Sequence, residues 1–253
     1  MTTKDDFFIR ENEIAFIPDE YYTPMKLYVQ FLDAFARSTY KSIYVIDYYK
    51  KNFLYVSDNP LFLCGMPAEK VREMGYEFYI NHVPESNLPL LLEINRAGFI
   101  FAENVSAENK MEYTLSYDFE IKQPMGKSLL INHKITPLLL TNDGKVWLAL
   151  CTASLSSHPD IGNIEVTRNG HNTHWKYNLN THCWEECTCA NLKDCEKEVL
   201  YLSAQGYTMN DISERMYKSL NTIKGYKRQI FEKLDVGSIT EAVSMAIINK
   251  KMI

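Results

Sequence analysis

The stretch that decides the fold of this chain runs from residue 192 to residue 251 and contains three short helical patterns almost end to end. They read LKDCEKEVLYLSAQG (192–206), YTMNDISERMY (207–217) and SLNTIKGYKRQIFEKL (219–234). A fourth helical pattern follows over residues 238–248. The closing residues of the chain are therefore expected to form a compact helical domain over 192–253.

Small polar residues and one glycine predict where these helices begin and end. Gly206 is a helix stop, because glycine accepts the left-handed conformation without a Cβ clash. Thr208, followed three residues later by Asp211, resembles a capping box. Ser219 is a good N-cap, since its hydroxyl accepts an otherwise unpaired backbone N–H. The second and third helices are separated by only a few residues, so they must cross steeply, as in a helix-turn-helix.

The third helix has an apolar face. At about 100° per residue, Ile223, Ile230 and Leu234 share one stripe, with Tyr226 and Phe231 on its shoulders. This face is expected to pack on the first two helices.

The opposite arc of the third helix is cationic and amide-bearing, and it is open at one glycine. Its members are Asn221, Lys224, Gly225, Arg228 and Gln229. Lysine and arginine can reach guanine O6 and N7, and Asn or Gln can pair with adenine. Gly225 would let the backbone approach the bases closely. A basic, solvated helix face is the simpler alternative, but the capped three-helix context favours a helix that reads the major groove.

This segment resembles a LuxR-type (GerE-like) helix-turn-helix. The residues that carry the resemblance are Glu196, Glu198, Val199, Leu200, Gly206, Ile212, Ser219, Thr222, Ile223, Lys224, Lys233 and Leu234. The resemblance implies binding to double-stranded DNA, usually as a homodimer on paired half-sites. It also implies that the fourth helix, Ile239 to Ile248, contributes to self-association.

Carried over position by position, the resemblance places Lys224, Gly225 and Arg228 against bases, and Thr222 and Lys227 against the phosphate backbone. Three residues depart from the family pattern. Lys193 stands where the family usually has a Ser or Thr N-cap, which leaves Glu196 without its capping-box partner. Tyr226 replaces a common histidine, and Cys195, expected to be buried in the first helix, replaces a common arginine.

The length of 253 residues suits two modest domains. No apolar run approaches the ~20 residues needed to cross a bilayer, and the charged start, MTTKDD, is no secretory signal. A cytoplasmic protein is expected.

Charge is divided unevenly along the chain. From Leu192 onward there are 10 Lys and Arg against 8 Asp and Glu, a net of +2. Of the 27 basic and 32 acidic residues in the whole chain, 17 and 24 remain for the rest, a net of −7. Phosphate neutralisation needs excess cations, so the acidic part is not expected to bind nucleic acid.

Residues 1–39 form a lead-in that contains one amphipathic helix. Between Pro24 and Thr39 the apolar residues recur at three- and four-residue spacing. This helix could cover its own sheet or pair with a second copy in a dimer, and the sequence leaves both open.

Residues 40–157 read as an antiparallel sheet with helices inserted. Strands are expected over 42–47 and 52–57 and again over 112–121, 128–140 and 146–153, the last closing the sheet. Gly144 supplies the turn before the last strand. Consecutive hairpins exclude a doubly wound parallel sheet, so the fold class is α+β.

The order of these elements resembles a PAS domain. The suggestive residues are VSDN (56–59) with Gly65, HVPE (82–85) and NDG (142–144). The resemblance implies a sensing or dimerising module with a pocket between sheet and helices. Cys64 lacks the motif of a flavin photoreceptor, and His82 is better explained as a surface or helix-capping histidine than as a haem ligand. No cofactor is predicted, and a small-molecule ligand is left open.

Residues 158–191 form a connector with weak strand character at 164–168 and 174–177 and a cluster of cysteines. His182, Cys183, Cys187, Cys189 and Cys195 could build a zinc site. Their spacing lacks the paired Cys-x2-Cys knuckles of zinc sites, so thiols on a β-linker, without metal, are the favoured interpretation.

The sequence therefore predicts a DNA-binding transcriptional regulator, with RNA polymerase as a further partner left open. One alternative is a response regulator with a phosphorylated receiver, because Asp47 ends a strand, although the receiver's β/α alternation is missing. The other is an enzyme with a helical tail. No nucleophile elbow, phosphate-binding glycine loop or paired carboxylates support it, so no catalytic residue is predicted.

Overall fold

The computed structural model of the chain describes residues 2–171, 173–188 and 191–248. The chain divides into two compact units. The first contains the residues up to Glu186, except for a short piece at 173–174 that groups with the second, and the second continues from Cys187. Each unit is described by itself.

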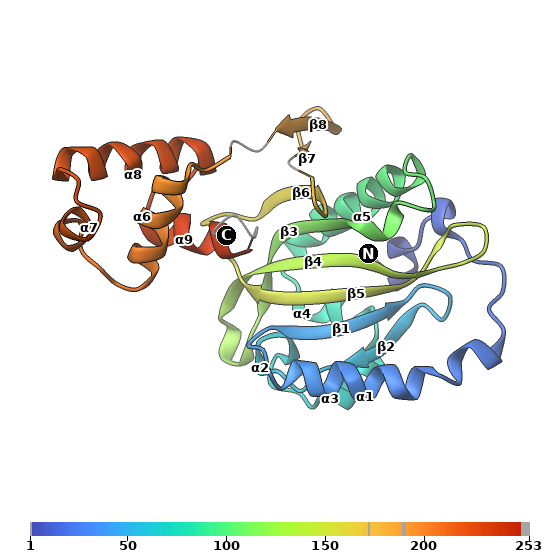
Figure 1. Ribbon diagram of the computed structural model, residues 1–253. Coiled ribbons are helices and arrows are strands. Elements are labelled where there is room, and N and C mark those ends of the chain that lie inside the picture. Colours follow the sequence, from blue (N-terminus) through green and yellow to red (C-terminus); the bar gives the residue numbers. More distant parts are fainter. Residues whose placement is uncertain (1, 172, 189–190, 249–253) are drawn as a thin grey trace. The chain divides into compact units, whose positions relative to one another are not determined.

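The strands of the described residues form one sheet in the order β2-β1-β5-β4-β3-β6-β7-β8 (Figure 1). Their bounds are β1 Ser42–Asp47, β2 Asn52–Val56, β3 Tyr113–Lys122, β4 Ser128–Leu140, β5 Val146–Leu155, β6 Gly162–Arg168, β7 Thr173–Asn178 and β8 Cys183–Thr188. The pairs β1–β2, β1–β5, β3–β4, β3–β6 and β4–β5 are all antiparallel.

Along the chain, the helices of the first unit come before β1 and between β2 and β3. They are α1 Met25–Ala36, α2 Pro60–Leu63, α3 Ala68–Met74, α4 Glu77–His82 and α5 Leu88–Glu103. Short 3-10 helices occur at Lys4–Phe7, Arg10–Asn12, Asp19–Tyr22, Glu85–Asn87, Lys110–Glu112 and Pro124–Gly126.

Two strands, a run of helices and then three antiparallel strands form the PAS-like arrangement that the sequence predicted. The α+β fold class is confirmed. The β4–β5 hairpin turns where expected: Gly144 has a φ of +78°, and its N–H donates to the carbonyl of Thr141 at 2.9 Å. Glycine adopts this left-handed conformation without strain because it lacks a Cβ.

One prediction about the sheet is wrong. The strand over 146–153 does not close the sheet, because β5 lies between β1 and β4. Residues of the expected connector instead extend the sheet beyond β3, where Tyr113 pairs with Arg168 and Leu115 with Val166. This pairing joins segments about fifty residues apart, and alternation within either strand does not reveal it. The division at residues 157 and 191 remains a prediction.

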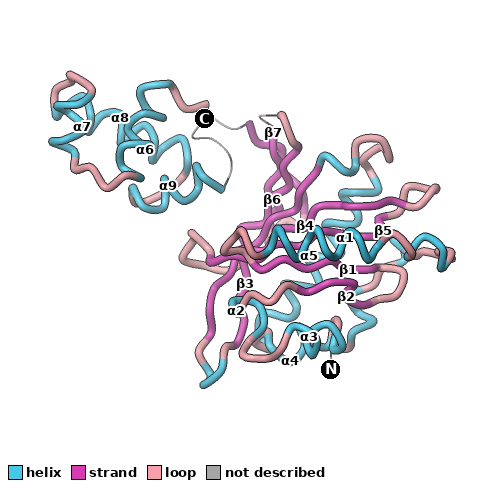
Figure 2. Tube along the Cα trace, turned by 60° about the horizontal axis from the view of Figure 1, so that its bottom comes forward, coloured by secondary structure: helices cyan, strands magenta, loops and turns pink. Residues whose placement is uncertain are grey.

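The two faces of the sheet are covered by different helices. Tyr44, Ile46 and Cys151 belong to the core beneath α2 to α5, whereas Val45 and Leu148 belong to the core beneath α1. Successive residues of one strand point to opposite faces, so α1 covers one face and the other helices cover the other. Figure 2 shows α1 running along the sheet near β1.

Helix α1 uses one stripe to cover its own sheet, which settles one of the two alternatives. Met25, Val29 and Leu32 pack in the same cluster as Val45 and Leu148. A second stripe on α1 is exposed, and pairing with a second copy stays a prediction.

The described part of the second unit consists of four helices around a small apolar core. They are α6 Asp194–Ala204, α7 Met209–Arg215, α8 Leu220–Leu234 and α9 Ile239–Ile248. Val199 and Leu200 of α6, Ile212 of α7, and Ile223 and Ile230 of α8 are buried together. None of the helices in the described ranges of the chain is long and apolar enough to span a membrane.

Candidate nucleic-acid interface

The helix ends predicted from the sequence are confirmed. Thr208 and Asp211 form a reciprocal capping box at α7: the N–H of Thr208 donates to the Asp211 carboxylate at 2.9 Å. The N–H of Asp211 donates to the Thr208 hydroxyl at 3.3 Å. Ser219 caps α8 by accepting the N–H of Thr222 at 3.2 Å. Gly206, with a φ of +85°, follows the end of α6.

The apolar face of α8 packs as its spacing predicted. Ile223 and Ile230 are fully buried, Leu234 is nearly so, and Tyr226 and Phe231 lie half-buried at the margin. This packing fixes the rotation of α8 about its own axis and so determines which side chains the helix presents to solvent.

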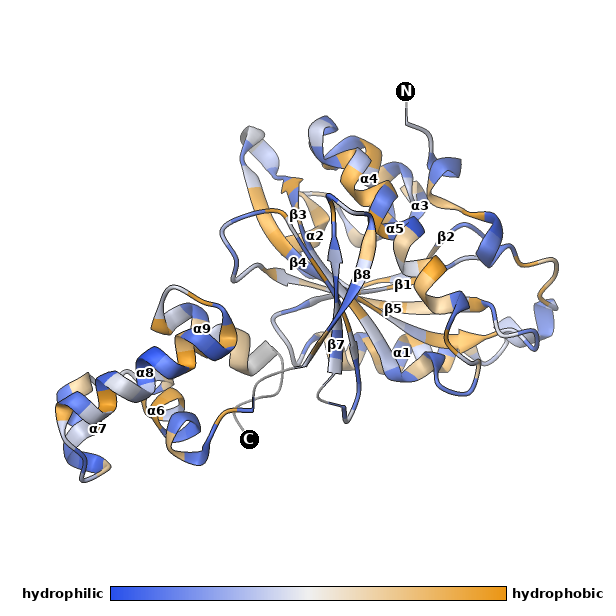
Figure 3. Ribbon diagram, turned by 90° about the horizontal axis from the view of Figure 1, so that it is seen from above, coloured by the Kyte–Doolittle hydropathy of each residue, from blue (hydrophilic) through white to orange (hydrophobic). Residues whose placement is uncertain are grey.

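The opposite face of α8 is open to solvent, and much of this helix is hydrophilic in Figure 3. The exposed members of the predicted set are Asn221, Lys224, Gly225, Arg228 and Gln229. Apart from its chain neighbours and the nearby backbone of α8 itself, nothing lies within 4 Å of the position that a Cβ on Gly225 would occupy. The face therefore combines two long cations, two amides and a bare stretch of backbone, the groups that a major-groove helix uses.

The two predicted phosphate contacts lie at the edge of this face. Thr222 and Lys227 are half-buried. The Thr222 hydroxyl is 2.9 Å from that of Ser219, and the ammonium of Lys227 lies 5.4 Å from the centre of the Phe231 ring. Arg228 makes one ion pair, with Glu232 at 3.4 Å. Both side chains of this pair are exposed, so it contributes little to stability and leaves Arg228 able to move to another acceptor.

A buried ion pair ties α8 to the first helix of the domain. The Glu196 carboxylate accepts one hydrogen bond from the ammonium of Lys233 at 2.7 Å and another from the backbone N–H of Lys193 at 2.7 Å. The expectation that Glu196 lacks a capping partner is therefore only half right. Lys193 has no side-chain acceptor to offer, but the carboxylate still reaches back to the first turn.

Two of the residues that depart from the family pattern contact each other. Cys195 lies in α6 as expected, but it is half-buried rather than buried. Its side chain is hydrogen-bonded to that of Tyr226, and this bond raises the pKa of Tyr226. The phenol is thus held against α6 rather than projecting from the groove-facing side of α8.

The candidate metal and cofactor residues are scattered. Cys183 is exposed on β8, and Cys189 lies outside the described residues. Among the residues whose placement is given, no three His, Cys, Asp or Glu side chains come together as a metal site needs. His82 stacks on Phe78, and its Nδ1 lies 3.1 Å from the Phe78 carbonyl, which fits the helix-capping role. That the protein uses neither metal nor cofactor remains a prediction.

The receiver alternative does not fit the surroundings of Asp47. Its carboxylate is buried, where it accepts the N–H groups of Tyr49 and Lys50 at 3.0 Å and the hydroxyl of Tyr22 at 2.6 Å. These bonds close the β1–β2 turn and engage both oxygens. The antiparallel sheet also differs from the parallel β/α alternation of a receiver.

The capped tri-helical core and the open polar face of α8 define a helix-turn-helix DNA-binding domain. Residues 190–246 match the family GerE, bacterial regulatory proteins of the luxR family. The C-terminal domain is thus a LuxR-type helix-turn-helix domain, and it follows a PAS-like domain in the same chain.

The sequence of one curated relative matches this domain, and solved structures give distant matches to longer parts of the chain. The oxygen regulatory protein NreC of Staphylococcus haemolyticus (strain JCSC1435) is 40% identical over 55 residues, which are 22% of this chain and 25% of NreC. The chain thus matches only about a quarter of the length of that relative. The solved structure of a Vibrio cholerae VqmA dimer, described among LuxR-type receptors, is 17% identical over 86% of each chain with a TM-score of 0.36. A PAS domain from Colwellia psychrerythraea is 16% identical over 52% of this chain and 96% of its own, also with a TM-score of 0.36.

Proposed function

We propose that this protein is a transcriptional regulator that binds DNA by inserting α8 into the major groove. The observation that carries the proposal is the exposed face of Asn221, Lys224, Gly225, Arg228 and Gln229 on a helix whose other face is locked in a core. Lys224, Gly225 and Arg228 are assigned to base edges, and Thr222 and Lys227 to phosphates. The net charge of the chain from Leu192 onward is only +2, so contacts with bases must contribute to binding alongside phosphate neutralisation.

The test is selection of duplexes from a random-sequence pool by the full-length protein, followed by titration over a range of salt concentrations. The expected result is an inverted repeat whose half-sites lie about one helical turn apart, bound with an affinity that falls as salt rises. Binding that shows no preference for any duplex would contradict the proposal.

We further propose that the protein binds DNA as a homodimer and that α1 supplies part of the contact. Leu27, Tyr28, Phe31 and Phe35 are each at least half exposed and lie outside the sheet-covering stripe of α1. Neighbouring large apolar side chains that are exposed together on one helix often mark an interaction surface. Because a two-fold contact uses the same patch on both subunits, one such stripe suffices.

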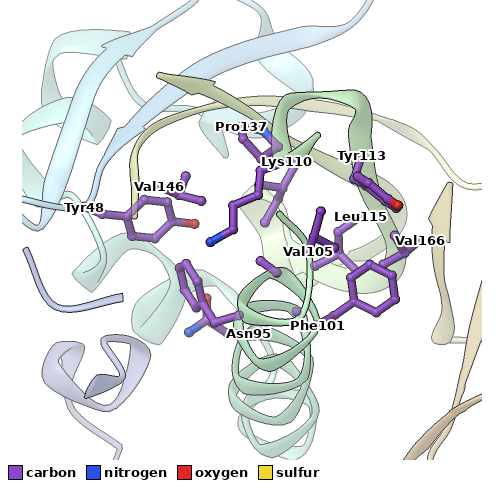
Figure 4. Close-up of a pocket in the computed structure, with 14 residues that line it drawn as sticks. Tyr48, Asn95, Phe101, Val105, Lys110, Tyr113, Leu115, Pro137, Val146 and Val166 are labelled. Atoms are coloured by element: carbon purple, nitrogen blue, oxygen red, sulfur yellow. The ribbon is translucent and has the colours of Figure 1, made fainter. Parts of the chain in front are cut away.

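We also propose that the PAS-like domain senses a small molecule in a cavity between α5 and the sheet (Figure 4). The cavity measures about 70 Å³. It is lined mostly by apolar and aromatic side chains, among them Phe99, Phe101, Val105, Leu115, Ile135 and Val166. Sites for drug-sized ligands measure roughly 300–1,000 Å³, so a ligand here would be no larger than a single small ring.

The charged side chain in the lining of this cavity is Lys110, which the sequence did not single out. Its side chain is 8% exposed, and its ammonium donates to the carbonyl of Gly144 at 2.8 Å, with Glu103 at 3.8 Å. In Figure 4 the ammonium points toward Tyr48. An ammonium has three N–H groups to donate, so a ligand with a hydrogen-bond acceptor suits this end.

A panel of single-ring compounds with and without an acceptor group tests the sensing proposal. Compounds with the acceptor should raise the thermal midpoint of the wild-type chain by mass action, and they should lose this effect in Lys110→Met and in the cavity-filling Ala102→Leu. A panel that shifts neither the midpoint nor the DNA affinity would count against a ligand of this class.

Four narrower assignments belong to the same proposal. The boundaries at residues 39, 157 and 191 separate lead-in, sensor, connector and DNA-binding domain. The protein is assigned no catalytic residue and a cytoplasmic location. RNA polymerase is a partner only if regulation includes activation.

A further inference from the structure

Three helices of the DNA-binding domain end in the same hydrogen-bonding motif, and one of them does so with an unexpected residue. The N–H of Tyr207 donates to Leu202, that of Lys218 to Ser213 and that of Val236 to Phe231, each spanning five residues. The residue before each donor is left-handed in such a Schellman motif.

The three left-handed residues are Gly206, Tyr217 and Asp235, with φ values of +85°, +51° and +55°. Glycine adopts this conformation without a steric penalty, and Asp adopts it more readily than most residues. Tyrosine is not suited to it, and the turn of a helix-turn-helix often contains glycine. The turn between α7 and α8 thus holds a bulky aromatic in a conformation that a smaller residue would adopt more easily.

Packing does not explain this choice. Tyr217 is 93% exposed, more than any other large apolar or aromatic side chain in the described residues; the next, Phe16 and Tyr40, are 70% exposed. The phenol therefore adds nothing to the core of the domain that would offset an unfavourable backbone conformation.

The turn that carries Tyr217 is held in place on both sides. The N–H of Tyr217 donates to Glu214 at 3.2 Å, and the hydroxyl of Ser213 donates to the carbonyl of Lys218 at 2.6 Å. Ser219, two residues on, caps α8. The Tyr217 side chain thus leaves a rigid turn directly beside the end of α8 that is assigned to the groove.

We propose that the hydroxyl of Tyr217 binds a phosphate oxygen at the edge of the major groove and so positions the N-terminus of α8 on the duplex. This inference rests on the proposed DNA-binding function. In helix-turn-helix complexes the N-terminal residues of the recognition helix meet base edges while the neighbouring segments meet the backbone. Tyrosine hydroxyls are among the groups that contact phosphates and fix register without reading sequence. Tyr217 is thus a positioning residue.

Two substitutions test this role in the full-length chain, with a duplex selected from a random pool by the wild-type protein. Tyr217→Phe removes only the hydroxyl and should weaken binding about three- to tenfold, the effect of losing one hydrogen bond. Tyr217→Asn suits the left-handed conformation. It should weaken binding at least as much, while hydrogen exchange of the α7 and α8 amides slows by about twofold or more. Weaker binding by a more stable domain is a combination that a purely structural role would not give.

Controls separate a failure of this inference from a failure of DNA binding itself. Tyr201→Phe, which removes the hydroxyl of an exposed tyrosine on α6, should leave affinity unchanged. Lys227→Ala should lower the slope of log affinity against log salt by about one, whereas Tyr217→Phe should not, because a neutral donor releases no counterion.

Each remaining outcome decides against the inference. If Lys224→Ala weakens binding but Tyr217→Phe does not, DNA binding stands and the role of Tyr217 is overturned. If Tyr217→Asn speeds amide exchange, the phenol supports the fold, and the role is overturned as well. If the wild-type protein prefers no duplex, the proposed function and this inference fail together.

Discussion

The ammonium of Lys233, close to the end of α8, lies 2.7 Å from Oε2 of Glu196 in the first turn of α6. Glu196 is fully buried, and its other carboxylate oxygen has no hydrogen-bond partner among the described residues. The ion pair therefore connects the recognition helix to the start of the domain across the core. A carboxylate taken out of water needs this partner, because an unpaired buried charge is strongly destabilising.

Removing the ammonium should be more harmful than removing the whole pair. Lys233→Met leaves the Glu196 carboxylate buried without its cation and should lower the free energy of unfolding of the helical domain by about 3–5 kcal/mol. The double change Glu196→Gln with Lys233→Met should recover most of that loss, since neither charge remains. Urea unfolding followed by far-UV circular dichroism measures both.

Lys227→Met provides the matched control for the stability test, because Lys227 lies on the same helix and its ammonium lies over the Phe231 ring, 5.4 Å from its centre. It should change the unfolding free energy by less than about 1 kcal/mol. Equal losses for Lys227→Met and Lys233→Met would mean that the ion pair has no special role.

The groove-facing cations are expected to affect binding without affecting the fold. Lys224→Ala and Arg228→Ala should each weaken binding to the selected duplex by about 1–3 kcal/mol and relax specificity at one base pair. Far-UV spectra should not change, because Lys224 is exposed and the Arg228 ion pair with Glu232 is solvent-exposed. Fluorescence anisotropy with the wild-type duplex and single-base variants measures both effects. Lys193 is exposed at the start of α6, so Lys193→Ala should leave DNA affinity nearly unchanged. A loss of affinity similar to that of Lys224→Ala would point to a general charge effect.

Local structure in this chain was predictable because its signals lie within a few residues of each other. The Thr208–Asp211 capping box, the Ser219 cap and the Gly144 turn each depend on groups three or four residues apart. The apolar face of α8 follows from helical periodicity alone.

What the sequence did not reveal depends on contacts between distant segments. The attachment of β6 to β3 pairs residues such as Tyr113 and Arg168, and the cavity gathers side chains between residues 48 and 166. Lys110 gives no sign in the sequence that it is buried. Glu196 and Lys233 were recognised as parts of a family pattern, but their ion pair joins positions 37 residues apart and required the fold.

A buried histidine should make the stability of the first unit depend on pH. His133 is fully buried; its Nε2 is hydrogen-bonded to the Tyr44 hydroxyl, and its Nδ1 has no hydrogen-bond partner among the described residues. Burial lowers the pKa of His133 to about 3. Between an unfolded-state pKa of about 6.5 and this value, the unfolded chain binds a proton that the native one does not. Stability should therefore fall as pH falls, by up to about 1.4 kcal/mol per pH unit.

Unfolding of wild-type protein and His133→Gln between pH 7.5 and 5 tests this dependence. Glutamine keeps a polar group near Tyr44 but does not titrate, so the stability of the variant should decline less steeply on acidification. The other histidines are common to both proteins and cancel in the difference. Parallel curves would show that His133 is not the group responsible.

The exposed stripe of α1 gives the sharpest test of assembly. Phe31 is 69% exposed, so Phe31→Glu should leave the fold intact while placing two carboxylates against each other across a two-fold contact. Sedimentation should then show a monomer for the variant and a dimer for the wild-type protein. Affinity for a paired half-site duplex should fall at least tenfold, because the second half-site loses its high effective concentration, while binding to an isolated half-site should stay unchanged. Met111→Glu, at a 50% exposed residue outside α1, is the control that should remain dimeric. A dimeric Phe31→Glu variant would place the dimer contact elsewhere, and the fourth helix of the DNA-binding domain would then be the next segment to test.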